Sequence, residues 1–256
     1  MDHTDAVTIR RALSHVVRLG SLMGATLLVV LLMAACGGED SAPEPVTTGT
    51  AGIAPPQLDP NAAVPAGPGP TRAEVEALGY AYGDSGAPIH VIEMSDFGCG
   101  YCKKFHEEVF PVLLEEYVET GKVHWRFIPF DNGMFPNAQG ALNAGVCAGE
   151  LGNIREAGLQ LFSRQREWKR AGDVSADLLA IVTDAGVEPA EWSDCIETGV
   201  HADKGAAFTR MARRLGVRGT PTFFIDGYPI QGALPLETFR EVFESVLTER
   251  ATAESE

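Results

Sequence analysis

Length, composition and charge limit what this chain can be. It has 256 residues, of which 45% are hydrophobic and 21% charged, and this ordinary globular composition excludes a wholly disordered chain and a small scaffold held by disulfides alone. Lys and Arg number 20 against 35 Asp and Glu, and the resulting net charge of −15 repels a phosphate backbone. We therefore expect no nucleic-acid partner.

The N-terminal stretch has the pattern of an export signal. Arg10, Arg11 and Arg18 precede a run without charge over residues 19–35, which ends in Ala34-Ala35. A basic region, an apolar core and terminal small residues are typical of a secretory signal, so residues 1–35 are predicted to be one. A permanent membrane span is the alternative, but the run is at the short end of what crosses about 30 Å of hydrocarbon.

Cys36 directly follows this run. The segment Leu32-Met33-Ala34-Ala35-Cys36-Gly37 resembles a bacterial lipobox, in which cleavage precedes a cysteine whose thiol receives diacylglycerol, although Met33 stands where lipoboxes prefer Leu. Each buried CH₂ of an acyl chain contributes about 0.8 kcal/mol, so lipidation of Cys36 is expected to anchor the chain to a bacterial membrane, facing the periplasm or the cell surface. Cleavage before an unmodified Cys36 is the alternative.

Proline content separates the signal from the folded domain. Residues 37–70 hold eight of the 16 prolines and show no apolar period, so residues 36–70 are predicted to be a lipidated cysteine with a linker. The domain is expected over residues 71–250. The acidic segment 251–256 is expected to fray.

The first part of the domain is predicted to be a strand, a helix and a strand. Residues 89–94 are β-rich and are followed by Cys99-Gly100-Tyr101-Cys102, and residues 123–129 alternate as a second strand would. Between them a helical period runs through Phe105, Val109, Leu113 and Tyr117, and Gly121 closes it. The CxxC motif therefore begins the helix of a β-α-β unit.

A CxxC motif in the first helical turn is suited to redox chemistry. Cysteines three positions apart there have Cα atoms about 5 Å apart, within reach of a disulfide. The unpaired N–H groups and partial positive charge of the helix start stabilise a thiolate on Cys99, which is the expected nucleophile. Stabilising that thiolate stabilises the reduced pair, and this makes the Cys99–Cys102 disulfide a stronger oxidant.

Other uses of a CxxC motif fit this sequence less well. Attachment of c-type haem requires His after the second cysteine, where this chain has Lys103. A structural zinc site needs four ligands and only His106 is near, so no metal is expected. An inert disulfide is a further alternative, although so short a loop at a helix start favours a labile bridge.

Residues from about 80 to 248 resemble the DsbA-like thiol-disulfide oxidoreductases of the thioredoxin fold. Three elements carry the resemblance: Glu93 six residues before Cys99, the motif Cys99-Gly100-Tyr101-Cys102, and the loop Gly219-Thr220-Pro221-Thr222. It implies an α/β thioredoxin fold with an inserted helical subdomain, a cis Pro221 facing the CxxC motif, and catalysis without a cofactor. In this reading Thr220 offers backbone groups to an extended substrate, and a buried Glu93 exchanges a proton with Cys102. A surface strand glutamate is the alternative for Glu93.

The inserted helices are expected over residues 137–215 and contain Cys147 and Cys195. With Cys36 set aside, four cysteines are left, and the sequence alone allows three pairings among them. We favour a structural disulfide between Cys147 and Cys195, worth about 4 kcal/mol in the chain-entropy model. Two buried free thiols, or a redox relay to Cys99, are the alternatives. After Pro221 a hairpin across Asp226-Gly227 and a helix from Pro235 to about Leu247 are predicted.

Two further expectations concern side chains near the motif. Lys103 and His106 are expected to be solvated on the exposed first turns of the CxxC helix. The aromatic residues Trp125, Phe127, Phe130 and Phe135 are expected to lie in the core rather than to line a substrate groove.

The resemblance implies an extracytoplasmic enzyme that exchanges disulfides with secreted or periplasmic proteins, as an oxidant coupled to a membrane quinone-linked thiol oxidase. Gly100-Tyr101 resembles the DsbC-like isomerases, so an isomerase or reductase is the second reading. Isomerases of that kind carry an N-terminal dimerisation domain where this chain has its linker, so a monomer is expected. A non-catalytic tethered binding module is the third.

Overall fold

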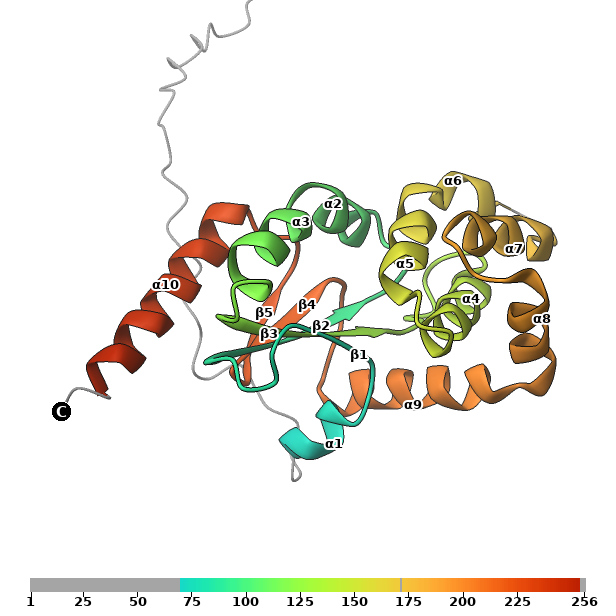
Figure 1. The fold of residues 1–256 in the computed structure, drawn as a ribbon. Coiled ribbons are helices and arrows are strands. Elements are labelled where there is room, and N and C mark those ends of the chain that lie inside the picture. The colour runs from blue at the N-terminus through green and yellow to red at the C-terminus, as the bar shows by residue number, and fades with distance from the viewer. Residues whose placement is uncertain (1–69, 171, 254–256) are drawn as a thin grey trace, which may run out of the picture. The chain divides into compact units, whose positions relative to one another are not determined.

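The computed structural model describes residues 70–170 and 172–253 (Figure 1). The signal, the lipidation site Cys36 and nearly all of the linker predicted for residues 36–70 lie outside the described residues, as does the end of the chain from residue 254. Within the described ranges, no helix is both long and apolar enough to cross a membrane.

A mixed five-stranded sheet forms the centre of the domain. Its strands lie in the order β1 (Tyr80–Tyr82), β3 (Val123–Pro129), β2 (Ile89–Ser95), β4 (Thr222–Ile225) and β5 (Tyr228–Gln231). β2 and β3 are parallel, and the other pairs are antiparallel. Glu93 thus lies on the central strand, opposite Phe127 of β3 and Phe223 of β4.

Alternation along β2 gives the sheet two different faces. Ile89, Val91, Glu93 and Ser95 share one face because side chains alternate along a strand. The apolar core on that face includes Phe105, Phe239 and Phe243, which come from α2 (Gly100–Glu108) and α10 (Leu236–Ala253). The opposite face is covered by α1 (Arg72–Glu76), α9 (Val200–Arg214) and part of α4 (Ala138–Glu150), as Val75, Phe208 and Leu142 show.

The connection from the CxxC motif to β3 differs from the single helix predicted through Tyr117. It breaks into α2, α3 (Phe110–Leu113) and a π-helical turn, η1 (Leu114–Val118). Pro111 lies at the start of α3, where it has no amide hydrogen to donate to the preceding turn. The single-helix prediction was therefore wrong at Pro111, although the crossover from β2 to β3 is helical as expected.

Among the described residues, six helices lie between β3 and β4, as the predicted insertion over residues 137–215 requires. They are α4, α5 (Ile154–Ser163), α6 (Gln165–Trp168), α7 (Ser175–Asp184), α8 (Pro189–Thr198) and α9 (Figure 1). Their core includes Leu161, Trp168, Ile181 and Trp192. A disulfide joins Cys147 of α4 to Cys195 of α8, with an S–S distance of 2.05 Å and a Cα–Cα distance of 5.9 Å.

Both ends of the domain contain structure that the sequence did not predict. Thr71 caps α1 in a reciprocal capping box with Glu74, and β1 pairs with β3. The last helix was predicted to end near Leu247 and residues 251–256 to fray, but α10 continues to Ala253. An ion pair between Arg250 and Asp226, at 2.7 Å, ties this extension to the hairpin.

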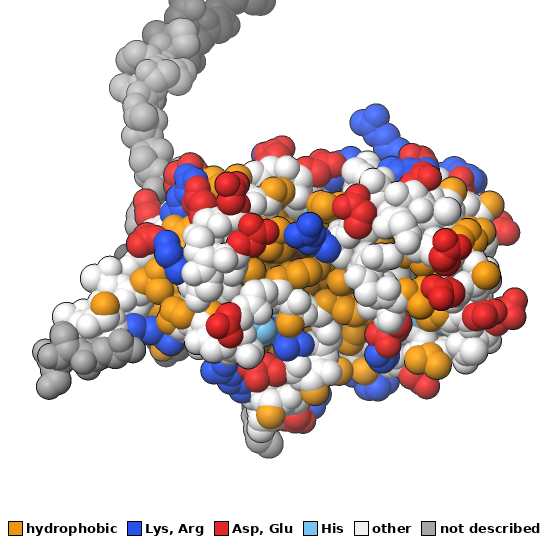
Figure 2. Space-filling model, in the orientation of Figure 1, with side chains coloured by type: hydrophobic (Ala, Val, Ile, Leu, Met, Phe, Trp, Pro, Cys, Tyr) orange, Lys and Arg blue, Asp and Glu red, His pale blue; other side chains and the backbone are white. Residues whose placement is uncertain are grey.

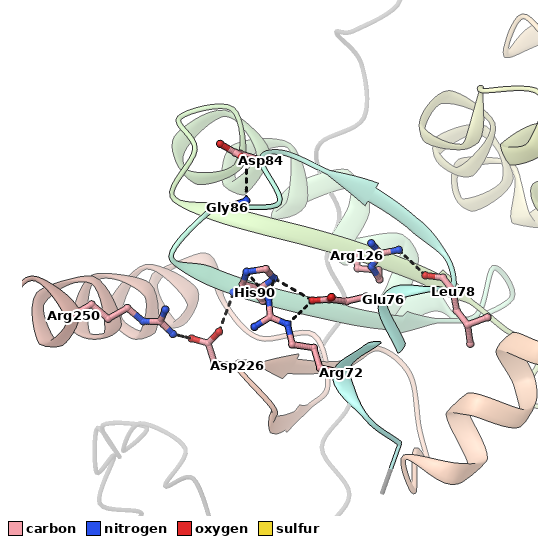
Figure 3. A network of polar contacts seen from close by, with 9 residues as sticks. All are labelled: Arg72, Glu76, Leu78, Asp84, Gly86, His90, Arg126, Asp226 and Arg250. Atoms are coloured by element: carbon pink, nitrogen blue, oxygen red, sulfur yellow. Dashed lines mark hydrogen bonds and ion pairs between the residues drawn. The ribbon is translucent and has the colours of Figure 1, made fainter. Parts of the chain in front are cut away.

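A polar network fixes the end of β2 that lies opposite the CxxC motif (Figure 3). The His90 amide donates to Asp226 Oδ1 at 3.0 Å, and Asp226 also pairs with Arg250 of α10. The Arg72 guanidinium contacts the His90 ring at 2.8 Å and pairs with Glu76 at 2.5 Å. The network joins α1, the central strand, the β4–β5 turn and α10.

Candidate active site

A short loop positions Cys99 at the end of the central strand. β2 ends at Ser95, and Cys99 is the N-cap residue of α2. The Asp96 carbonyl accepts a hydrogen bond from the Cys99 amide at 2.9 Å, and its carboxylate accepts from the amides of Gly98 at 2.7 Å and Asn132 at 2.9 Å. Burial raises the pKa of Asp96 to about 6, although both amide bonds oppose this shift.

The surroundings of the Cys99 sulfur favour its thiolate form. Its pKa is lowered to about 5, chiefly by a hydrogen bond from the Cys102 side chain, with further bonds from the amides of Cys102 and Tyr101. The Cys102 amide lies 3.5 Å from Cys99 Sγ. Burial acts in the opposite direction and is outweighed. The helix start therefore stabilises negative charge on this sulfur, as the N–H groups of a first turn do in general.

Cys102 has the opposite preference. It is fully buried, and burial raises its pKa well above the usual value, with its contacts to Cys99 acting in the same direction. Hydrogen bonds to the Ser95 side chain and to the Asp96 backbone oppose that shift. One sulfur of the pair is thus stabilised as a thiolate and the other as a thiol.

The proline loop faces Cys99. The Thr220–Pro221 peptide bond is cis, and the Thr220 carbonyl oxygen lies 3.2 Å from Cys99 Sγ, from which it accepts a hydrogen bond when Cys99 is a thiol. The Pro221 carbonyl accepts from the Gly232 amide at 2.8 Å, which ties the loop to the end of the hairpin. The structure therefore brings together Cys99, Cys102, Thr220 and Pro221 from two segments about 120 residues apart.

Glu93 is fully buried beneath the CxxC helix, so it is not the surface glutamate of the alternative reading. Its Oε2 accepts from Trp125 Nε1 at 3.1 Å, and its Oε1 lies 2.7 Å from His106 Nε2. The Ser95 hydroxyl also donates to Oε1. The carboxyl group therefore has three side-chain partners in the protein interior.

The expected exposure of His106 was wrong. Its exposed fraction is 6%, and its ring stacks on Phe162 of α5 at 4.4 Å. His106 follows Cys102 by four positions, so the helical period places both residues on the buried face of α2. Lys103 is only partly exposed, and its ammonium donates to the Ser163 carbonyl at 2.8 Å.

The other residues of the predicted site have different surroundings. Gly100 and Tyr101 lie at the surface, and Tyr101 is 70% exposed. Trp125, Phe127 and Phe130 are buried as expected. Phe135 is only partly buried and lies against Gly98, with the Lys169 ammonium 4.6 Å from its ring centre.

Two residues of the inserted helices hold the active-site loop and were missed in the sequence. Gln165 Nε2 donates to the carbonyls of Phe97 at 2.6 Å and Cys99 at 2.9 Å. The Lys169 ammonium donates to the Gly98 carbonyl at 2.5 Å. These contacts span 66 to 71 positions, and no local pattern marks them.

One group of metal-ligating residue types occurs among residues 70–170 and 172–253. The side chains of Cys147, Cys195 and His201 have ligand atoms within 4.8 Å of one another. Both sulfur atoms belong to the disulfide, so neither is a thiolate ligand.

Comparison with known proteins agrees with this geometry. A family model described as thioredoxin matches residues 77–245, about two thirds of the chain. Disulfide bond formation protein D of Bacillus subtilis is 22% identical over 174 residues, which cover 64% of this chain and 75% of that protein.

Two solved structures show the same fold. The crystal structure of Wolbachia pipientis α-DsbA1 superposes with a TM-score of 0.61 at 24% identity and covers 72% of this chain and 100% of that one. Oxidised BdbD of Bacillus subtilis gives a TM-score of 0.57 at 18% identity and covers 70% of this chain and 96% of that one. With its paired cysteines, buried glutamate and proline loop, the chain belongs to the thioredoxin family, in which it is a DsbA-like thiol-disulfide oxidoreductase.

Proposed function

We propose that this protein is an extracytoplasmic oxidant that introduces disulfides into secreted or periplasmic proteins. A substrate thiolate attacks Cys99 Sγ, the Cys99–Cys102 bond breaks, and Cys102 leaves with the electron pair and takes up a proton. A second substrate thiolate then attacks the substrate sulfur of the mixed disulfide. The substrate leaves oxidised, and Cys99 leaves as a thiolate.

One observation carries this proposal, the stabilised thiolate of Cys99. Its pKa is lowered to about 5, chiefly by the hydrogen bond from Cys102, so reduction of the pair is favoured at neutral pH. A disulfide whose reduced form is stabilised in this way is an oxidising one. Reoxidation needs an acceptor for two electrons, and we assign that role to a membrane quinone-linked thiol oxidase.

The proline loop supports a binding mode for the substrate. The Thr220 carbonyl lies 3.2 Å from Cys99 Sγ, so an extended segment that pairs with the Thr220 backbone brings its own cysteine to the reacting sulfur. In this mode the protein recognises the backbone of the substrate rather than its side chains, so the mode fits substrates of varied sequence.

Export and anchoring belong to the same proposal. The signal pattern of residues 1–35 and the lipobox ending at Cys36 support an exported chain held at a membrane by its lipidated cysteine, with residues 37–70 as a spacer. We propose that the protein works there as a monomer.

An isomerase or reductase is the second candidate, and the Gly100-Tyr101 dipeptide between the cysteines favours it. The reduction potential of Cys99–Cys102 against glutathione separates the candidates. We expect a value near that of an oxidase, about −120 mV, whereas a value near −270 mV would indicate a reductase.

A trapping experiment tests the assigned order of the two cysteines. Cys102→Ser is expected to accumulate a mixed disulfide between Cys99 and a peptide disulfide, because no second thiol resolves it, whereas Cys99→Ser should form none. Mass spectrometry identifies the adduct. A Cys99→Ser protein that oxidises a reduced peptide as fast as the unaltered protein would contradict the catalytic role of Cys99. The third reading, a non-catalytic binding module, would then be the only one left.

A further inference from the structure

Cys147, Cys195 and His201 form a compact cluster inside the inserted helices. They come from α4, α8 and α9, and each has a ligand atom within 4.8 Å of those of the other two. Cys147 is fully buried, His201 is 6% exposed, and Cys195 is partly buried. Because the two sulfur atoms are bonded to each other, reduction of this bond would place two thiols beside a buried histidine.

The His201 ring is held as the rings of metal-binding histidines are. Its Nδ1 lies 3.1 Å from the Cys195 carbonyl, which can only accept a hydrogen bond. Nδ1 therefore carries a hydrogen, and the lone pair of the neutral ring lies on Nε2. Histidines that bind a metal almost always donate their other ring N–H to a carbonyl or a carboxylate in this way. The nitrogen that could bind a metal is thus already fixed by a partner within the cluster.

The spacing of the three ligand atoms suits one zinc ion once the two sulfurs are separate. A tetrahedral ion with Zn–S distances of about 2.3 Å and a Zn–N distance of about 2.0–2.1 Å holds its donor atoms about 3.5–3.8 Å apart. All three ligand atoms already lie within 4.8 Å, and the Cα atoms of the two cysteines are 5.9 Å apart, so small side-chain rotations bring the donors together. Two thiolates balance the charge of Zn²⁺, which removes the cost of burying an unpaired charge. Three protein ligands leave the fourth position to solvent, as in other zinc sites of this composition.

The surface beside the cluster is acidic. Glu188, Glu191, Asp194 and Glu197 are exposed on α8 or just before it, and residues 188–198 include no Lys or Arg. Figure 2 shows Asp and Glu side chains along the edge of the insertion where α8 lies in Figure 1. Negative potential of this kind raises the local concentration of cations. The partly exposed sulfur, that of Cys195, belongs to the same helix.

We propose that reduction of the Cys147–Cys195 disulfide converts this cluster into a zinc site with Cys147, Cys195 and His201 as ligands. A dithiol reductant supplies the two electrons. Its first thiolate attacks the partly exposed Cys195 Sγ, and Cys147 leaves and takes up a proton. Its second thiolate then attacks the reductant's own sulfur in the mixed disulfide, so the reductant leaves as a disulfide and Cys195 leaves and takes up a proton. Zinc binding releases both thiol protons to solvent, and His201 binds through its lone pair.

Zinc would join the same two helices that the disulfide joins. With the disulfide reduced, the metal links α4 to α8 through the two sulfur atoms, so the insertion keeps a cross-link in both redox states. The sequence-based expectation of no metal concerned the CxxC motif, which this site does not include. The inference is also independent of the proposed thiol-disulfide exchange at Cys99.

Zinc binding is tested in the chain with Cys36→Ser, Cys99→Ser and Cys102→Ser, in which Cys147 and Cys195 are the only cysteines left of five. The protein is reduced with dithiothreitol, which is then removed in the absence of oxygen, and Zn²⁺ is titrated in competition with a chromogenic chelator. We expect one zinc ion to bind to each reduced chain and none to bind to the oxidised chain. Equal binding by the two forms, no binding by the reduced form, or a disulfide that dithiothreitol does not reduce in the folded protein would overturn the proposal.

A histidine substitution tests the third ligand. In the same chain, His201→Gln keeps a hydrogen-bond donor for the Cys195 carbonyl but removes the imidazole. It should weaken zinc binding more than 10-fold, since loss of an outer hydrogen-bond partner alone costs at least that much. His124→Gln is the matched control, because His124 of β3 is likewise 6% exposed but lies outside the cluster, and its zinc affinity should be unchanged. Equal affinities of the two variants would overturn the role of His201.

Circular dichroism separates metal binding from loss of structure. If reduction lowers the helical signal, Zn²⁺ should restore it, because the metal links α4 to α8 again, whereas Mg²⁺, which prefers oxygen ligands, should not. A reduced chain that remains unfolded with Zn²⁺, or that Mg²⁺ restores equally well, would also overturn the proposal.

Discussion

Cys99 and Cys102 lie one helical turn apart, yet the protein favours charge on one sulfur and not on the other. Cys99 receives hydrogen bonds from the Cys102 side chain and from two amides, which lower its pKa to about 5. Cys102 is fully buried, and burial raises its pKa. The difference supports the proposal that Cys99 is the attacking and leaving sulfur in reactions with substrates and that Cys102 acts within the protein.

The lowered pKa of Cys99 predicts a pH-dependent stability of the reduced protein. The thiolate stabilises the folded reduced form fully above the unfolded pKa of about 8.5, and this contribution is lost as the pH falls toward 5. Between pH 5 and 8 the reduced form should therefore gain about 1.4 kcal/mol per pH unit relative to the oxidised form, which has no titrating thiol at the site. Urea unfolding of both forms at several pH values measures this difference. Parallel pH profiles would contradict the prediction.

At the residue scale, spacing predicted the paired cysteines at the helix start but not the buried side chains beneath them. A CxxC at a helix start carries its own signal, and the family resemblance added Glu93, Thr220 and Pro221. The four-residue spacing between Cys102 and His106 places both side chains on the same face of the helix. His106 was nevertheless assigned to the surface because it is polar. Ser95 lies two positions after Glu93 and therefore shares its strand face. The prediction of site residues on this face stopped at Glu93.

At the element scale, the inserted helices support the active-site loop through hydrogen bonds. Gln165 of α6 donates to the carbonyls of Phe97 and Cys99, and Lys169 donates to that of Gly98. All three carbonyls lie in the short connection from β2 to α2. The insertion therefore fixes the start of the CxxC helix as well as covering one side of the domain.

Removal of the Gln165 amide should destabilise the protein. Gln165→Ala leaves two carbonyls without their side-chain donor in a buried region, and we expect it to lower the free energy of unfolding by about 1–3 kcal/mol. Gln139→Ala is the matched control, because Gln139 is exposed and bonds only to Asn143 on its own helix. Its effect should stay within about 0.5 kcal/mol. Equal effects of the two substitutions in urea unfolding would contradict this role of Gln165.

Element prediction succeeded where a local period was strong. The β2 segment followed from its β-rich composition, β3 from alternation, and the hairpin from the Asp226-Gly227 turn, where both residues have positive φ. α1 and β1 are too short to show a period, and β1 depends on pairing with β3, a contact across more than 40 positions. The helix breaks at Pro111 because proline has no amide hydrogen to donate, whereas the apolar spacing predicted one continuous helix.

At the scale of the whole molecule, the sheet brings the two halves of the site together. β2 ends at the CxxC loop and β4 begins just after Pro221, and these strands are antiparallel neighbours. That adjacency places the proline loop against Cys99. The Cys147–Cys195 bridge closes a separation of 48 positions within the insertion, away from this sheet contact.

The proposed lipid anchor at Cys36 predicts where the whole protein resides. In a bacterial host the unaltered chain should incorporate a fatty-acid label and sediment with membranes. Cys36→Ser should lose the label and appear in the soluble extracytoplasmic fraction, because no acyl chain remains to hold it. A Cys36→Ser protein that still sediments with membranes after a salt wash would count against the anchor.

The thiolate of Cys99 is the central claim, and its ionisation can be observed directly. In reduced protein with the Cys147–Cys195 disulfide intact, the thiolate absorbance near 240 nm should rise with a midpoint near pH 5, and this transition should be missing in Cys99→Ser. A midpoint near 8.5, the value of an unperturbed thiol, would contradict the account.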